Sequence, residues 1–477
     1  MKKAYVLVDI GGNSKVAVFG IDGEKLALKS MLTKYDSDPD FAFGGMSFDA
    51  PQMADRICEL IRETLAEAGP VEVLAVSSSS QREGIVLIGH EGEPVVGYPN
   101  SDIRGMEWMG DVDWDRIAQL TTLDPSPIYS VLKYVGTKNR QPEVAARTAT
   151  FTSISDWVGQ LFTGKAVWEH SQAIHSLVYD IHKREWSQEL CDMFEIDMGI
   201  LPPLADAGQV LGGIRPEIAA ATGIPESAVF VVGGADTQTA IFGSNAGLGD
   251  TVLVAGSTNP LVRLDEDTER PDGWIGWVSP HIFPNQYMKE VNTGCLGINL
   301  QIFKERFFPD TPYEELERMA AERGIPACTA VFAMSTHIPD DLVLAGAFFL
   351  DNPIRADVEP VDYYHALILN NAFYMGIGLK ELAISTDTGK GYVIGCAGGF
   401  NSRLSAQALA DVSGLEVRVY EQSDSATMIG CLNLCNRALD LPEFVPALKF
   451  AATPAPSDDL NDYYDNWLSK REVIKNS

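Results

Sequence analysis

Short apolar runs alternate with polar turns at the start of the chain. Apolar runs cover Tyr5–Val8 and Lys15–Gly20, and a third begins at Lys25. Asp22-Gly23 between two of these runs is a hairpin signal. The pattern predicts a meander of three strands. It does not predict a signal peptide, because the first apolar run is too short and no small-residue cleavage site follows it.

The next segments mix helical and strand spacing. One face of a predicted helix over 53–68 collects six apolar residues: Met53, Ile57, Leu60, Ile61, Leu65 and Ala68. Strands are predicted over Val73–Ser77 and Ile85–Ile88. Strands interleaved with helices indicate the α/β class.

The opening pattern appears a second time near the middle of the chain. A predicted strand at Val229–Val232 leads to Asp236, an apolar run ends at Gly243, and a third strand is predicted over Thr251–Ala255. Asp9 and Asp236 thus open similar segments, which suggests an internal duplication of a three-strand unit with its helices. Chance similarity of two short segments is the alternative.

The last third continues the α/β pattern. Strands are predicted at Tyr392–Ile394 and Val417–Tyr420, with a helix through Leu404, Ala408 and Val412 between them. A further helix is predicted over 425–439, where Cys431 and Cys435 lie on one buried face. A polar surface helix is predicted over 457–477.

Composition excludes several classes of function. The 477 residues carry a formal charge of −30, with 21% charged and 45% hydrophobic residues. That apolar content fits a folded protein with large cores rather than an acidic disordered chain. The acidic excess argues against a nucleic-acid partner. Seven scattered cysteines without a CxxC pair suit a reducing cytoplasm. No stretch approaches the ~20 apolar residues of a membrane span.

Three glycine-rich turns each follow a predicted strand. They are Gly11-Gly12 followed by Asn13-Ser14-Lys15, Gly256-Ser257-Thr258, and Gly398-Gly399 with Asn401. Exposed backbone N–H groups in such turns can bind phosphate oxygens without a net positive field. A Walker sequence is absent, because Lys390 is followed by glycine, and so is a strand-to-helix GxGxxG.

Two acids and one polar segment are the other candidates for chemistry. Asp9 and Asp236 each end a strand beside glycines, where an acid can hold Mg²⁺ or take a proton from a hydroxyl; turn capping is the plain alternative. Ser77–Ser80 with Gln81, Arg82 and Glu83 would be costly to bury without partners, which a polyhydroxylated ligand would supply. A solvated surface loop is the alternative reading. Asn100, Asp102 and Arg104 form a further polar cluster.

Six segments together form a set of family motifs. They are Gln81–Gly84, Asn100–Arg104, Asp156-Trp157 with Leu161–Gly164, Leu201–Leu204, Gly233–Gln238 and Ala410–Leu415. This set resembles the FGGY carbohydrate kinases of the actin-like ATPase superfamily, over about residues 4 to 475. Gln81-Arg82-Glu83 is similar to glycerol kinases, and the run from Arg82 to Leu87 is similar to autoinducer-2 kinases.

The first glycine turn departs from the family pattern. The family usually begins D-x-G-T and places a basic residue seven positions after the Asp. Here Asp9-Ile10-Gly11-Gly12-Asn13 lacks the Thr, and Lys15 comes one position early. The second turn reads Gly-Ser-Thr instead of Gly-Thr-Ser, which keeps a hydroxyl.

The resemblance implies two actin-like (ribonuclease H-like) α/β domains with a ligand cleft between them. Residues 1–230 would bind a small sugar or polyol, and residues 231–477 would bind ATP. Asp236 would be the catalytic base, Asp9 would hold Mg²⁺, and the substrate would also contact Gln81, Arg82, Glu83 and Asp102. ATP would contact the three glycine turns: Gly11, Gly12, Asn13, Ser14, Lys15, Gly256, Ser257, Thr258, Gly398, Gly399 and Asn401.

The predicted activity is ATP-dependent phosphorylation of a sugar, ketose or polyol hydroxyl by a cytoplasmic enzyme. Two alternatives stay open: a sugar or nucleotide sensor that kept the fold, and a glucokinase-type hexose kinase. Neither a nucleic acid nor a membrane is an expected partner. The sequence does not fix the oligomeric state, although dimers are common among the kinases that it resembles.

Overall fold

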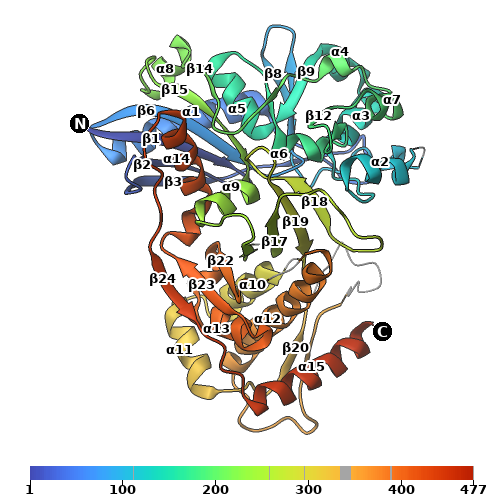
Figure 1. Cartoon of the computed structure of the whole chain (residues 1–477), viewed down its shortest axis with the longest axis vertical. Coiled ribbons are helices and arrows are strands. Elements are labelled where there is room, and N and C mark those ends of the chain that lie inside the picture. The colour runs from blue at the N-terminus through green and yellow to red at the C-terminus, as the bar shows by residue number, and fades with distance from the viewer. Residues whose placement is uncertain (111, 257, 295, 333–344, 387–388, 476–477) are drawn as a thin grey trace. The chain divides into compact units, whose positions relative to one another are not determined.

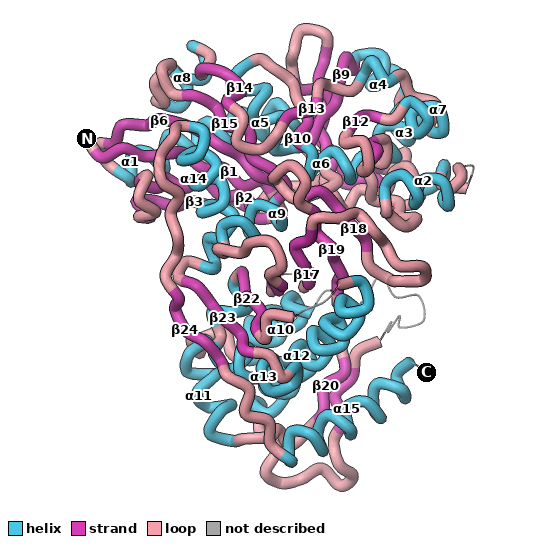
Figure 2. The backbone as a smooth tube through the Cα atoms, in the orientation of Figure 1, coloured by secondary structure: helices cyan, strands magenta, loops and turns pink. Residues whose placement is uncertain are grey.

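The structure is a computed structural model that describes residues 1–110, 112–256, 258–294, 296–332, 345–386 and 389–475. The chain forms two compact units, shown in Figure 1. The first unit consists of Met1–Gly243, Val278–Tyr287 and Thr427–Val445. The second consists of Ser244–Trp277, Met288–Ala426 and Pro446–Ser477. Both units mix strands and helices (Figure 2), which confirms the predicted α/β class.

The first unit is built on a six-stranded sheet with the strand order β14-β15-β6-β1-β2-β3. Its strands are β1 (Lys2–Ile10), β2 (Asn13–Gly20), β3 (Lys25–Leu32), β6 (Val71–Ser80), β14 (Val210–Gly213) and β15 (Val229–Ala235). The predicted N-terminal meander is confirmed, since β1 pairs antiparallel with β2 and β2 with β3. β6 lies parallel to both β1 and β15.

Both faces of this sheet are buried, which explains the continuous apolar run of β1. Val6 and Val8 belong to a core shared with helices α1 (Ala50–Ala68), α5 (Ile154–Thr163) and α8 (Pro216–Thr222). Tyr5 and Leu7 face a second core, to which α14 (Ala426–Ala438) contributes. Alternate residues of a strand point to opposite faces, so a strand covered on both sides must be apolar at every position.

Helix α1 shows how local sequence sets the element boundaries. Asp49 caps its N-terminus by accepting a hydrogen bond from the Gln52 N–H at 2.9 Å, and Gly69 follows its last turn. The predicted apolar face is buried at Met53, Ile57, Leu60 and Ile61.

The first unit also contains further helices and strands outside its main sheet. The helices are α2 (Trp114–Thr121), α3 (Ser130–Arg140), α4 (Pro142–Arg147), α6 (His170–Ala173), α7 (Gln188–Met193) and α9 (Asp236–Gly243). β7 (Ile85–Gly89) pairs with β8 (Pro94–Tyr98) and β9 (Thr148–Ser153). The short strands are β4 (Asp36–Asp38), β5 (Gly45–Ser47), β10 (Trp168–Glu169), β11 (Tyr179–Asp180), β12 (Glu185–Trp186) and β13 (Leu204–Ala205).

The second main sheet has the order β18-β19-β17-β16-β22-β23-β24. Its strands are β16 (Thr251–Val254), β17 (Pro260–Asp265), β18 (Trp277–Pro280), β19 (Tyr287–Asn292), β22 (Tyr392–Cys396), β23 (Glu416–Tyr420) and β24 (Leu448–Ala452). Most of this sheet belongs to the second unit, but Val278–Pro280 of β18 belong to the first. The helices are α10 (Leu296–Phe307), α11 (Tyr313–Arg323), α12 (Pro360–Ser385), α13 (Arg403–Ser413) and α15 (Asp458–Lys475), and β20 (Thr329–Val331) pairs with β21 (Ala347–Phe349).

The two main sheets repeat one topology, but the repeat does not begin where the sequence suggested. β16 is antiparallel to β17 and parallel to β22, as β1 is to β2 and β6. β22 is parallel to β23, and β23 is antiparallel to β24, as β6, β15 and β14 are. The predicted match of Asp236 to Asp9 is therefore wrong: Asp236 begins helix α9, and β16 is the counterpart of β1.

Two other predictions have mixed outcomes. The helix predicted for the tail is present as α15, but Trp467 is fully buried against Phe373 and Tyr374, so one face of the helix is packed. The six described cysteines are free and buried, including Cys431 and Cys435 on α14. Among the described residues, the chain has no helix with the length and apolar character of a membrane span.

Candidate active site

The first glycine turn connects β1 to β2 and places Asp9 opposite Lys15. These two residues form the last cross-strand pair of the hairpin. Burial raises the pKa of the Asp9 carboxyl to about 7, with a further contribution from Asp236, while Lys15 acts in the opposite direction. Asp9 is thus an acid in a poorly solvated position that a cation would stabilise.

The turn itself offers backbone groups rather than a hydroxyl. A Cβ added at Gly11 or Gly12 would meet no atom within 4 Å, so the space beside both residues is open. The buried Ser14 hydroxyl faces inward, where it hydrogen-bonds to Thr33 Oγ1 at 2.7 Å and donates to the Gly11 carbonyl at 3.2 Å. Asn13 is exposed and Lys15 is half-buried. The residues available to an anionic ligand are therefore Gly11, Gly12, Asn13 and Lys15.

Asp236 is the first residue of α9 and follows the last residue of β15. Its Oδ1 accepts a hydrogen bond from the Thr237 N–H at 2.6 Å. Burial raises the pKa of the Asp236 carboxyl, Glu83 adds to the increase, and Arg82 opposes it. β1 and β15 both run parallel to β6 between them, so Asp9 and Asp236 lie at the same end of these strands, and the charge of Asp236 acts on the Asp9 carboxyl.

A β-bulge precedes Asp236. Val231 pairs with Ser77 and Gly234 pairs with Ser79, so two residues of β15 oppose Ser78 alone. A Cβ at Gly233 would lie 1.7 Å from the Ser78 carbonyl oxygen, which explains why glycine occupies this position. Bulges redirect the strand end and its side chains beside functional sites.

Arg82 and Glu83 lie just beyond β6. Glu83 has a positive φ of 62°, an uncommon conformation for a residue other than glycine. Its carboxylate is 3.0 Å from His175 Nδ1, and the Ser130 hydroxyl donates to its backbone carbonyl at 3.0 Å. Burial alone would raise the pKa of Glu83, but His175, with smaller effects of Arg82 and Lys133, holds it below the ordinary value.

Gln81 and the four serines are buried, and their partners are largely other parts of the protein. Ser78 donates to the Ser155 carbonyl at 2.7 Å and Ser79 to the Gly234 carbonyl at 2.9 Å. The Ser80 hydroxyl accepts from the Ser155 N–H at 3.0 Å. For Ser78, Ser79 and Ser80, the interpretation that a ligand must satisfy the serines is therefore wrong, because the fold supplies their partners.

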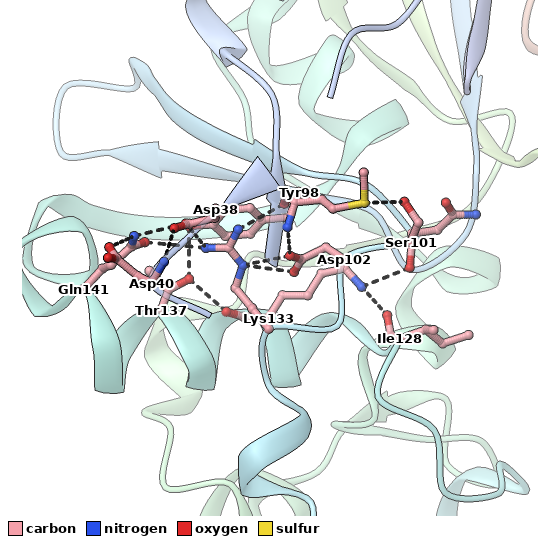
Figure 3. Close-up of polar contacts among 12 residues, drawn as sticks. Asp38, Asp40, Tyr98, Ser101, Asp102, Ile128, Lys133, Thr137 and Gln141 are labelled. Carbon is pink, nitrogen blue, oxygen red and sulfur yellow. Dashed lines mark hydrogen bonds and ion pairs between the residues drawn. The ribbon is translucent and has the colours of Figure 1, made fainter. Parts of the chain in front are cut away.

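Asp102 lies in a buried ionic cluster rather than on an open surface. Figure 3 shows it beside Tyr98, with Lys133 nearby. Arg104 Nε donates to both Asp102 oxygens at 3.1 and 3.0 Å, and the Met46 N–H donates to Oδ1 at 2.6 Å. The Arg104 guanidinium also lies 3.6 Å from the Tyr98 ring centroid. Asp102 is fully buried, so its main contacts are structural.

The second unit contains a cavity of about 1350 Å³. Four residues of the predicted nucleotide set line it: Gly256, Gly398, Gly399 and Asn401. Helices α11 and α12 complete its wall through residues such as Tyr313, Glu317 and Asn371. Thr258 is exposed and is not among the lining residues, and Ser257 lies outside the described residues.

The glycine turn at the cavity depends on close backbone contact. The Gly399 N–H donates to the Ala255 carbonyl at 2.9 Å. A Cβ at Gly399 would lie 2.6 Å from the Ala255 Cβ, whereas a Cβ at Gly398 would meet nothing within 4 Å. Gly399 therefore joins the two predicted turns of this unit, and Gly398 leaves space on the cavity side.

The donor set fits a weakly held magnesium ion better than a dedicated metal site. Within the described ranges, no group of three histidine, cysteine or acidic residues is placed to hold a metal. Asp9 and Asp236 lie at the same end of the first sheet, and the charge of Asp236 contributes to the raised pKa of Asp9. Mg²⁺ commonly binds through one or two carboxylates with water and substrate phosphates as its other ligands, and these two acids fit that mode.

Sequence reasoning missed two groups at the site of the first unit and one at the cavity of the second. His175 contacts Glu83, and Glu169 with Ser171 lies beside the strand end that precedes Asp236. A strong signal was lacking, since these residues lie in a short segment without metal spacing or helical periodicity. The α11 face of the cavity was also missed, because distant residues meet there only through folding.

The sequence matches the model for the N-terminal domain of the FGGY family of carbohydrate kinases over residues 4–243. The chain belongs to this family, and the predicted resemblance is confirmed. It is a phosphotransferase that acts on a sugar hydroxyl.

Relatives and solved structures agree with this assignment. "Putative sugar kinase YoaC" of Bacillus subtilis (strain 168) is 32% identical over an alignment that covers 100% of this chain and 98% of that protein. The autoinducer-2 kinase of Escherichia coli (strain K12) is 26% identical, with 90% and 85% of the two chains covered. The structure of Plasmodium falciparum glycerol kinase with ADP is similar in fold, with a TM-score of 0.85 at 15% identity and coverage of 99% and 98%.

Proposed function

We propose that the protein transfers the γ-phosphoryl group of ATP to a hydroxyl of a small sugar, ketose or polyol. Substrates of the pentulose, glycerol and autoinducer-2 type are the classes that the chain's resemblances favour. The observation that supports the proposal most is the pair of acids at the same end of the first sheet, Asp9 and Asp236, with Arg82 close to the second.

Asp236 is the proposed general base. Its raised pKa makes the carboxylate a stronger proton acceptor, while Arg82 keeps it from being fully neutralised. A base of this kind takes the proton of the attacking hydroxyl as the oxygen–phosphorus bond forms. Phosphoryl transfer requires little else from the protein than positioning and charge stabilisation.

The substrate contacts are proposed to come from the residues after β6. Glu83 is held ionised by His175, so it can accept a hydrogen bond from a sugar hydroxyl. Arg82 supplies a donor on the side of Asp236, and Gln81 lies beside them. Asp102 supports this wall through its buried pairing with Arg104.

The nucleotide is proposed to use backbone groups and the second-unit cavity. Gly11, Gly12, Asn13 and Lys15 are available for phosphate oxygens, and Asp9 would hold Mg²⁺. The cavity beside Gly256, Gly398, Gly399 and Asn401 would take the nucleoside. The metal, when bound, supplies positive charge to the phosphates. Residues 1–230 would then serve mainly the sugar and residues 231–477 mainly the nucleotide.

A coupled ADP-release screen over pentuloses, glycerol, other polyols and autoinducer-2 precursors tests the activity. With a substrate in hand, Asp236→Asn should lower kcat by about 100- to 10,000-fold, because the amide cannot accept the hydroxyl proton. Asp458→Asn, at the exposed first residue of α15, is the control and should leave kcat unchanged. Near-normal turnover by Asp236→Asn would contradict the base assignment.

The same screen, extended to aldohexoses and combined with calorimetry, separates the two alternatives. A sensor would bind a sugar or nucleotide in calorimetry without turnover over the whole panel. A glucokinase-type enzyme would turn over aldohexoses in preference to ketoses and polyols. The match to the FGGY family favours the ketose and polyol classes over the hexose alternative.

A further inference from the structure

The peptide group between Gly234 and Ala235, just before Asp236, is held at its carbonyl and at its N–H by side chains from other segments. The Ser79 hydroxyl donates to the Gly234 carbonyl at 2.9 Å. The Ala235 N–H donates to the Ser171 hydroxyl at 3.0 Å. Both serines are fully buried. The bulge interrupts the regular strand pairing here, so these side chains take over part of the hydrogen bonding that fixes the strand end.

Glu169 sets the direction of the Ser171 hydroxyl. That hydroxyl donates to Glu169 Oε2, and the same oxygen accepts the Ser171 N–H at 2.8 Å. The hydroxyl hydrogen is thereby committed to Glu169, which leaves an oxygen lone pair for the Ala235 N–H. A buried hydrogen-bond chain therefore runs from Glu169 through Ser171 to Ala235.

A second buried acid supports this chain. The Glu169 N–H donates to Asp156 Oδ2 at 3.0 Å, and the Ser153 hydroxyl donates to the same oxygen at 2.6 Å. Glu169 and Asp156 are both almost fully buried. Burying two acids is costly unless hydrogen bonds satisfy them, and these hydrogen bonds connect both acids to the segment before Asp236.

The end of β15 is also tightly packed against the hydrogen-bond chain of Glu169 and Ser171. A Cβ at Gly234 would lie 3.1 Å from Ser171 Oγ and 3.3 Å from Glu169 Oε2. On the opposite side, the backbone of Gly233 is in close contact with the Ser78 carbonyl. Loss of the Ser171 hydroxyl would thus free one side of a tightly enclosed segment.

We propose that Ser171 and Glu169 are positioning residues that fix the backbone in front of Asp236 and thereby direct its carboxylate toward the substrate hydroxyl. This rests on the proposed role of Asp236 as the base. The chain reaches Ala235 and not Arg82 or Glu83. Its loss should therefore affect the chemical step and leave sugar binding intact.

Steady-state kinetics of Ser171→Ala test the proposal. The expected result is a kcat reduced about 10- to 100-fold with the sugar KM within about twofold, since small misplacements of a catalytic group carry penalties of that size. Ser171→Thr keeps the hydroxyl and Glu169→Gln keeps an oxygen acceptor, so both should recover most of kcat. Glu169→Leu should behave like Ser171→Ala.

Ser176→Ala is a matched control in the same segment. Ser176 is also fully buried, donates to the Ala173 carbonyl at 2.6 Å and accepts the Val178 N–H at 3.1 Å, so both of these partners lie in its own segment. It should lose a similar amount of stability and keep kcat. A kcat of Ser171→Ala within twofold of the unmodified protein, or an equal loss in Ser176→Ala, would overturn the proposal.

Hydrogen exchange provides a test that needs no turnover. The Ala235 amide should exchange at least tenfold faster in Ser171→Ala than in the unmodified protein. Its exchange rate should be unchanged in Ser176→Ala. Unchanged exchange in Ser171→Ala would overturn the proposal. If the unmodified protein turned over no substrate while exchange behaved as expected, the proposed function would fail but the positioning of the strand end would stand.

Discussion

The hairpins β1–β2 and β16–β17 occupy the same place in two sheets of the same topology, yet they end differently. The last cross-strand pair of the first is Asp9 with Lys15, and that of the second is Leu253 with Leu261. The same scaffold therefore supports an ionic site in one unit and an apolar strand end in the other. Repetition of a fold does not imply repetition of its chemistry.

The neighbouring strands show the same contrast. In the first sheet, β6 and β15 lead to Arg82, Glu83 and Asp236, whose charges affect one another. In the second, β22 leads to Gly398 and Gly399, which shape a cavity wall. The first unit thus gathers groups that can move protons or bind cations, and the second offers space and backbone. The proposed division between chemistry and nucleotide binding follows from this difference.

The largest expected effect comes from removing the charge that distinguishes the first hairpin. Asp9→Asn should lower kcat/KM by about 1,000-fold, because a metal-binding charge is commonly worth several kcal/mol in the transition state. The free energy of unfolding without metal at pH 8 should instead rise by about 1 kcal/mol, because a poorly solvated charge near Asp236 is removed. Coupled ADP release and urea denaturation measure the two effects.

Asp22→Asn is the control for this experiment. Asp22 lies at the opposite end of the same hairpin, where it is exposed and pairs with Lys2 at 3.1 Å. Turnover of this variant should stay within about twofold of the unmodified protein. If Asp9→Asn lost stability or kept its activity, the Asp9–Lys15 pair would serve the fold and not the reaction. The difference from β16–β17 would then say nothing about function.

One glycine in each main sheet allows the two sheets to be compared by alanine substitution. Gly233→Ala should reduce the free energy of unfolding by about 3 kcal/mol or more, because the new methyl group meets the Ser78 carbonyl at 1.7 Å. Gly395→Ala should have a smaller effect, about 1–2 kcal/mol, because its nearest neighbour at 2.6 Å is Cγ of the Phe400 side chain, and a side chain can shift more easily than a strand backbone. Equal effects in urea denaturation would show that the bulge before Asp236 yields as easily as a side chain.

The local elements are the part of the structure that the sequence predicted best. Alternation and turn residues predicted the N-terminal meander, and helical spacing predicted α1 and α13. These patterns depend on neighbours in the chain, so they can be read without the fold. Asp9 and Asp236 were singled out because each comes at the end of an apolar run. The structure places them at the same end of the first sheet, although the duplication that the sequence suggested between them is not present.

The errors arose where burial or strand order decided the outcome. The run at Asp236–Gly243 has the composition of a strand, but its residues form α9, so the internal repeat was aligned one segment too early. The serines of β6 suggested a ligand because their partners, such as the carbonyls of Ser155 and Gly234, lie far away in sequence. Glu169 and Ser171 stayed unnoticed for the same reason.

The smallest expected effects concern two buried acids with opposite pKa shifts. Burial raises the pKa of Glu169 in the first unit to about 8. Asp250 in the second unit has a lowered pKa: burial opposes the change, but hydrogen bonds from Gly247, Lys390 and Tyr392 outweigh it. A raised acid pKa means that stability is lost as pH rises toward the folded pKa, whereas a lowered one means that stability is lost as pH falls through it.

Unfolding free energies from pH 3 to pH 8 separate the two cases. Glu169→Gln removes one titrating group, so its stability relative to the unmodified protein should rise by about 2 kcal/mol between pH 5 and pH 7.5. Asp250→Asn should be less stable by about 1–2 kcal/mol at pH 7, because it loses charged hydrogen bonds, and this deficit should shrink below pH 4. The raised pKa values of Asp156 and Asp9 lie close to that of Glu169. The unfolding free energy of Glu169→Gln should therefore still depend on pH in this range. If the stability of both variants relative to the unmodified protein changed with pH in the same way, the contrast between the two buried acids would be contradicted.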